Sequence, residues 1–257
     1  MILITLIDLA WSIQKIIYDI LILIYGTEIF YSEGNLCQLS ALTLGVTFRC
    51  SIWSLATLSM IRFIHGCLRV RAFPVFWFAF LGLNICFNVS MGIYSMMERS
   101  AKQNTTGVMC ASFQTLVPTS QYILLFNIVY LTLGSLIIVL CYFGSTVYIN
   151  QSIRYMVRDA RMKRDEELES NLIRQRWVLF INFGIISIVY LLAFYPPVIS
   201  YILKHLYGHK RGFVEDALIT VWGQLPCLFN SILTIYLHPE TNLRFFNFCR
   251  DIYDFYF

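Results

Sequence analysis

The feature that most constrains this chain is the recurrence of apolar stretches about as long as a lipid bilayer is thick. A transmembrane helix needs roughly 20 mostly apolar residues. Such stretches occur at about residues 1–26, 37–63, 74–97, 120–149, 177–203 and 214–237. Hydrophobic residues make up 58% of the chain and charged residues only 13%, whereas soluble domains average roughly 45–50% and about 25%. The sequence therefore predicts an all-α membrane protein, a six-span helical bundle that forms a single transmembrane domain over residues 1–257.

Basic residues assign the two sides of the predicted bundle, because short loops rich in Lys and Arg face the cytoplasm. The segment between the fourth and fifth stretches carries Arg154, Arg158, Arg161, Lys163, Arg164, Arg174 and Arg176. We expect this segment, the loop with Arg69 and Arg71, and the C-terminus to be cytoplasmic. The loops at about 27–36, 98–119 and 204–213 then face outward. The expected localisation is the plasma membrane, crossed several times.

Two local features depend on this topology. The sequon Asn104-Thr105-Thr106 falls in an outward loop, where N-glycosylation takes place, so Asn104 is a predicted glycosylation site. The basic segment at 154–176 also holds acidic residues at helical spacing. Either the flanking helices continue into the cytoplasm or the segment is a solvated loop.

Because a net charge of only +4 is spread over a membrane protein, nucleic acid is not an expected partner.

Several residues along the chain have spacings that form a joint pattern. Cys37 opens the second stretch, Arg62 follows it by 25 residues, and Asp8 precedes it by 29 residues. Farther on, Pro196 ends the segment Ala193-Phe194-Tyr195-Pro196, and Asn230 follows that proline by 34 residues. Taken together, these spacings resemble those of the rhodopsin-like (class A) G-protein-coupled receptors. The resemblance covers nearly the whole chain.

The resemblance implies the seven-transmembrane receptor fold without its first helix, since Asp8 matches the second helix of that family. The chain begins within an apolar run, at Met1-Ile2-Leu3-Ile4, which we interpret as a truncation, an incomplete gene model or a splice form. A genuine six-helix protein is the alternative. Ile61 stands where the family has an acidic residue and Phe194 where it has Trp, so the chain resembles a divergent orphan member. The implied partners are a heterotrimeric G protein and an extracellular ligand of unknown class.

The resemblance also implies roles for individual residues. It implies a disulfide between Cys37 and Cys110, both of which lie at outward-facing edges where the compartment is oxidising. The residues implied elsewhere are Arg62 and Tyr142 facing the G protein, Phe194, Pro196 and Asn230 in the activation switch, and Asp8, Ser51 and Asn230 around a possible sodium ion. Asp8 is also open to a structural role as a protonated or hydrogen-bonded core residue.

Charged residues inside a span are costly and are usually functional or paired. Lys15 and Asp19 are spaced i,i+4 and could pair. Arg49 lies near mid-membrane, about 18 Å along its helix from the outer end. It either pairs with an acid such as Asp19 or receives an anionic ligand. Under the resemblance, Leu44 replaces the Asp of amine receptors and Gln224 replaces the Lys that carries retinal in opsins. Neither a biogenic amine nor retinal is therefore an expected ligand. Leu44, Arg49 and Gln224 are the candidate pocket residues.

The C-terminal segment has a character of its own. After Pro239 the apolar side chains fall on one helical face, which predicts a short C-terminal interfacial helix at about 240–255 that lies on membrane lipid. Cys249 within it is a candidate for palmitoylation, with a free thiol as the alternative.

Other classes of function are less compatible with the sequence. The main alternative is a six-span membrane transporter or channel, although the halves show no internal repeat and no filter sequence is visible. An enzyme is not expected, because Ser135 and Ser145 lack a surrounding nucleophile motif and a base within a span. The Cys and His residues lack metal-site spacing, so no cofactor other than the possible sodium ion is expected.

Overall fold

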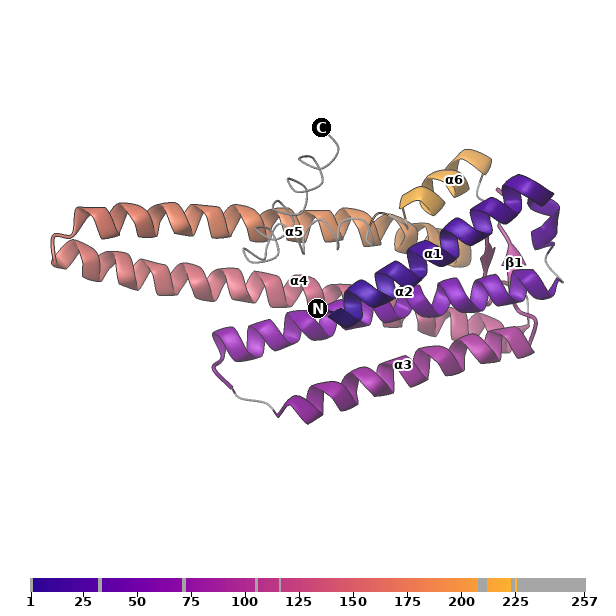
Figure 1. Ribbon diagram of the computed structural model, residues 1–257, viewed down its shortest axis with the longest axis horizontal. Helices are drawn as coiled ribbons and strands as arrows, with labels where there is room; N and C mark the ends of the chain where they lie inside the picture. The colour runs from indigo at the N-terminus through magenta and orange to yellow at the C-terminus, as the bar shows by residue number, and fades with distance from the viewer. Residues whose placement is uncertain are drawn as a thin grey trace, which may run out of the picture.

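The computed structural model is built almost entirely of helices (Figure 1). It describes residues 2–31, 34–70, 73–104, 106–115, 117–207, 212–222 and 225. The α-helices are α1 (Ile2–Tyr25), α2 (Asn35–Arg62), α3 (Pro74–Met97), α4 (Pro118–Met162), α5 (Glu166–Leu206) and α6 (Phe213–Trp222). The shorter elements are the 3-10 helix η1 (Thr27–Phe30), the π-helix η2 (Phe63–Cys67) and the strands β1 (Lys102–Gln103) and β2 (Cys110–Ala111), which pair antiparallel. The predicted all-α class is confirmed.

Three of these helical segments are long and apolar enough to cross a membrane, namely Asn35–Cys67, Pro74–Met97 and Pro118–Met162. They contain the predicted stretches 37–63, 74–97 and 120–149, and the chain therefore has the character of a membrane protein. Helices α1 and α5 contain the stretches 1–26, apart from its two end residues, and 177–203. Only the beginning of 214–237 belongs to the described residues, and the predicted interfacial helix at 240–255 lies outside them.

Helix α1 has two charged and two aromatic residues on its inner face and apolar residues on its outer face, unlike a helix in a water-soluble protein. The residues buried along it are Asp8, Trp11, Lys15 and Tyr18, which recur at i,i+3 and i,i+4 spacing. The large apolar residues Leu6, Leu9, Ile13 and Ile16 are about half exposed, at 49–58%. A surface of this kind is stable against lipid tails rather than water.

Helix α2 lies at the centre of the bundle and contacts α1, α3 and α4 (Figure 1). Its buried Ile52 and Trp53 pack against Ile138 and Tyr142 of α4. Small residues allow this close approach, as is usual between membrane helices. A Cβ atom on Gly134 of α4 would lie 3.0 Å from Ile52 Cγ2. Side chains of α2 therefore keep fixed neighbours along the length of the helix.

Helices α4 and α5 run far beyond the rest of the bundle as an antiparallel pair (Figure 1). The 45 residues of α4 extend about 68 Å at 1.5 Å per residue, more than twice the roughly 30 Å of a bilayer core. Arg161 near the end of α4 bonds Glu169 of α5 at 2.6 Å, which raises the pKa of Arg161. Asp165 caps α5 by accepting from the Leu168 amide at 2.9 Å. The segment 154–176 is therefore helical apart from a short turn, and the solvated-loop interpretation is wrong.

Candidate functional site

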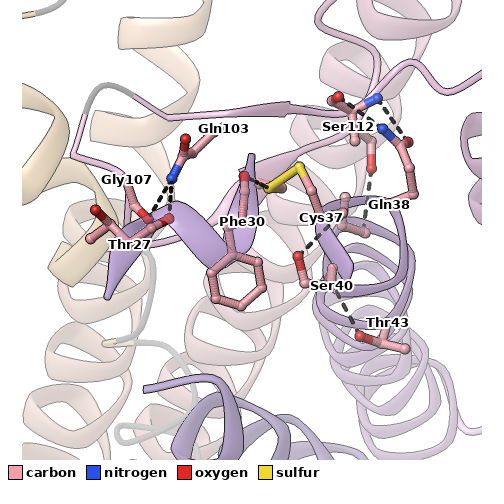
Figure 2. The surroundings of a disulfide bond; sticks show 12 residues. Thr27, Phe30, Cys37, Gln38, Ser40, Thr43, Gln103, Gly107 and Ser112 are labelled. Atoms are coloured by element: carbon pink, nitrogen blue, oxygen red, sulfur yellow. Dashed lines mark hydrogen bonds between the residues drawn. A yellow bond between two sulfur atoms is a disulfide. The ribbon is translucent and has the colours of Figure 1, made fainter. Parts of the chain in front are cut away.

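A disulfide anchors the β hairpin to the first turn of α2 (Figure 2). Cys37 and Cys110 are bonded with their Cα atoms 5.4 Å apart, across 73 residues of sequence. The predicted pairing is confirmed. Both half-cystines are almost completely buried, and Phe30 of η1 packs beside them. The Cys110 sulfur lies 3.6 Å from the Phe30 carbonyl oxygen, a packing contact, because a disulfide sulfur carries no proton to donate.

The β hairpin, η1 and the first turn of α2 together form a cap at one end of the bundle. Two glutamine side chains strengthen this cap by bonding backbone groups (Figure 2). Gln38 donates to the Ala101 carbonyl at 3.0 Å and accepts from the Ala101 amide at 3.2 Å. Gln103 donates to the carbonyls of Thr27 at 2.8 Å and Gly107 at 3.0 Å. The loops expected at 27–36 and 98–119 are thus joined directly at one end of the bundle.

Helix α6 joins the same cap from the far end of the sequence. Asp216, only 3% exposed, accepts from both the backbone amide and the hydroxyl of Thr106, each at 3.1 Å. Thr106 is the third residue of the predicted glycosylation sequon. Asn104 is the residue of this sequon that would carry the glycan. Its side chain lies at intermediate exposure beside a cavity.

That cavity lies under the cap, between the hairpin and five helices. Its volume is about 170 Å³, where one water needs roughly 10–15 Å³ on the same measure. Its walls come from α1, α2, α4, α5, α6 and the hairpin: Trp11, Lys15, Ala41, Leu44, Gly45, Phe48, Arg49, Asn104, Met109, Cys110, Ala111, Ser112, Leu124, Asn127, Ile128, Leu131, Val198, Ile219 and Thr220. The predicted pocket residues Leu44 and Arg49 are both in these walls, while Gln224 lies outside the described residues.

Arg49 is the unusual member of the cavity wall. It is 3% exposed, and within the described chain its Nε and Nη2 atoms are buried without a hydrogen-bond partner. Asp19, the acid considered as its partner, instead forms an ion pair with Lys15 at 2.6 Å. The predicted i,i+4 pair of Lys15 and Asp19 is therefore confirmed, and the described residues show no Arg49–Asp19 ion pair.

The position of the Arg49 guanidinium depends on the turn before it. Helical side chains tilt toward the N-terminus of their helix, so the guanidinium lies back over Gly45. A Cβ atom at Gly45 would lie 3.4 Å from Arg49 Nη1 and 3.6 Å from Ser112 Oγ of the hairpin. The absence of a side chain at Gly45 leaves room for the guanidinium below the cap.

A polar contact between α1 and α2 lies deeper in the bundle. Ser51 donates to Asp8 Oδ1 at 2.6 Å, and both residues are 4% exposed. The structure thus joins two of the three residues predicted around a sodium ion; Asn230 lies outside the described residues. Carboxylate and hydroxyl oxygens are hard donors that suit such an ion, so these two residues fit it.

The two residues predicted to face a cytoplasmic partner meet at the opposite end of α2. Arg62 Nη1 donates to the Tyr142 hydroxyl of α4 at 3.4 Å. Of the predicted switch residues, Pro196 is half-buried within α5, and Phe194 belongs to α5 with a side chain outside the description. Asn230 and the palmitoylation candidate Cys249 lie outside the described residues.

Sequence reasoning missed Trp11, Lys15 and Asn127 as cavity residues. The signal for the first two was present, because they lie on the inner face of α1 with Asp8 and Tyr18, a helical stripe of charged and aromatic residues inside an apolar segment. Asn127 had no such companion within α4. Comparison with known proteins adds no relative, because no family model matches the chain and the curated proteins contain no match.

Proposed function

We propose that this chain is a divergent rhodopsin-like G-protein-coupled receptor, which transduces an extracellular ligand to a cytoplasmic heterotrimeric G protein. One observation carries the proposal: α2 lines the cavity at one end and presents Arg62 against Tyr142 at the other. Arg49 and Arg62 are 13 residues apart, which corresponds to about 20 Å of helix. A single rigid element therefore reaches both sites.

The same proposal gives the membrane topology. We take α1, α5 and the segment that begins with α6 as the three further spans of a six-span bundle. The disulfide-capped end faces outward, because disulfides form in oxidising compartments. The turn between α4 and α5 lies at the other end (Figure 1) and carries the basic residues, which favours the cytoplasmic side of the plasma membrane. The C-terminus is then cytoplasmic as well.

Helix α5 is the helix that we expect to bend when this receptor is activated. It holds Pro196 within its length, and proline removes a helical hydrogen bond and permits bending. Its cytoplasmic part is tied to α4 by exposed contacts such as Arg161–Glu169, which contribute little stability. Bending at Pro196 would separate the cytoplasmic ends of the two helices and open the surface beside Tyr142.

The experiment that tests this function is a panel of G-protein dissociation sensors in cells that express the chain. Arg62→Gln is compared with Arg99→Gln, because Arg99 is exposed and follows the end of α3 on the side of the cap. With equal surface amounts, we expect basal dissociation for one G-protein class that Arg62→Gln abolishes and Arg99→Gln retains. No dissociation with any class, or equal dissociation in both variants, would contradict the function. Flux of solute through the protein would instead favour a transporter or channel.

A further inference from the structure

We propose that the cavity beneath the disulfide cap binds an amphipathic organic carboxylate, with the acid group on Arg49 and the apolar part against the surrounding helices. The proposal rests on the proposed receptor function, because it names the ligand class of that same cavity. Binding itself requires no G protein, so the two claims can fail separately.

The first argument is the state of Arg49. A guanidinium stays protonated in proteins and has five N–H donors in a planar fork. In this structure the side chain is buried in the cavity wall, and Nε and Nη2 find no acceptor among the described residues. A buried charge without a partner is strongly unfavourable. A carboxylate accepts two parallel hydrogen bonds from such a fork, which supplies the missing partner.

The second argument is the sign of the charge around the cavity. Among the wall residues given above, the charged ones are Lys15 and Arg49, both cationic. Lys15 Nζ bonds Asp19, but the Asp19 side chain is 47% exposed and does not line the cavity. An ammonium has three donors, so Lys15 has donors beyond this bond. The charged side chains in this wall therefore favour an anion over a cation.

The third argument is that most of the wall is apolar. Trp11, Phe48, Leu124, Ile128 and Leu131 contribute hydrophobic side chains. An inorganic anion would leave these surfaces against water, whereas an organic acid covers them. Asn127 adds one specific polar group, since its buried Oδ1 has no partner within the described chain. The cavity thus combines one cationic, anion-binding subsite with an apolar chamber, which is the pattern that an amphipathic acid would fit.

The test uses the purified full chain in phosphatidylcholine nanodiscs and fluorine NMR of matched probe pairs. The acids are 4-fluorophenylacetate, 5-fluoroindole-3-acetate and 6,6,6-trifluorohexanoate, and each is compared with the alcohol that replaces its carboxylate. We expect at least one acid to bind about tenfold or more tightly than its alcohol, as charge-assisted hydrogen bonds allow. Arg49→Gln should remove this difference, and Lys102→Gln, which changes an exposed cation on β1, should retain it.

Three results would overturn the proposal. One is that no acid binds up to 10 mM, and another is that Arg49→Gln binds the acids as the parent does. The third is that acids and alcohols bind equally while chloride or phosphate competes with neither, which would leave only an apolar chamber. If Arg49→Gln does not fold, Ile219→Trp fills the cavity from α6 without changing a charge. It should weaken the acid about tenfold, and unchanged binding would again contradict the proposal.

The two claims separate in the same preparation. Arg49-dependent acid binding without nucleotide exchange on any G protein would contradict the receptor function and support the ligand class. Nucleotide exchange that depends on Arg62, in a chain that binds no acid, would contradict the ligand class alone.

Discussion

Asp216 of α6 and Thr106 of the β hairpin are 110 residues apart and share two hydrogen bonds at 3.1 Å. Because the carboxylate is buried, these contacts hold the beginning of α6 to the disulfide cap. The cap therefore unites elements from the start, the middle and the later part of the described chain. Any ligand in the cavity would contact a wall that all three form together.

Loss of the Asp216 carboxylate should loosen that wall. Hydrogen bonds to charged groups contribute roughly 1.5–3 kcal/mol each, and Asp216→Asn should lower stability by about 2–4 kcal/mol. Thermal melting of the purified protein measures the change. Glu167→Gln, at an exposed position of α5, is the control and should melt within about a degree of the parent. Equal melting of the two variants would show that the contact does not hold the cap.

The sequence predicted the helices well where an apolar stretch has clear residues at its ends. The stretch at 74–97 coincides with α3, because Pro74 begins the helix and the polar residues after Met97 end it. The hairpin was not predicted, since two-residue strands have no alternating pattern to detect. Its position follows from the Cys37–Cys110 bond and from side chains such as Gln38 that bond its backbone.

The candidate site was predictable only in part, for a physical reason. Arg49 was identifiable as a charge inside a span, but its choice between an acid and a ligand depends on tertiary distances. By sequence, Asp19 was a plausible partner for either Lys15 or Arg49. In the structure it forms an ion pair with Lys15, one helical turn away. Asn127 could not be identified as a cavity residue from the sequence, because a single amide in an apolar helix does not reveal which way it faces.

The disulfide should be required for the cap to form. Cys37→Ser and Cys110→Ser each open a link of 73 residues, for which chain-entropy estimates give about 4 kcal/mol. We expect low surface expression for either variant and no additional loss for the double variant. Alkylation without reductant should leave Cys37 and Cys110 of the parent unmodified. Labelling of both would contradict the outward orientation as well as the bond.

Asn104 should carry an N-glycan when the protein is made in a secretory pathway. The Thr106 hydroxyl is buried against Asp216 in the folded protein, so modification must precede folding of the cap. Peptide-N-glycosidase should shift the parent in gel electrophoresis and leave Asn104→Gln unchanged. A shift that persists in Asn104→Gln would place the modification elsewhere and remove this support for the topology.

The contact between Asp8 and Ser51 should respond to sodium. An Asp carboxylate with a neighbouring hydroxyl offers two hard oxygen ligands. The parent should melt at higher temperature in sodium chloride than in choline chloride at equal ionic strength, and Asp8→Asn should abolish the difference. Ser54→Ala, which removes a different buried hydroxyl of α2, is the control. Equal melting of the parent in both salts would leave Asp8 a structural residue.

The most direct test of the account is nucleotide exchange by a G protein that shares nanodiscs with the chain and an acid shown to bind through Arg49. The account predicts that the acid changes the exchange rate of the parent. It also predicts that Arg62→Gln still binds the acid with unchanged Kd but loses the change in exchange. A rate that the acid leaves unaltered in the parent, or alters equally in Arg62→Gln, would contradict the coupling of the cavity to the Arg62 end of α2.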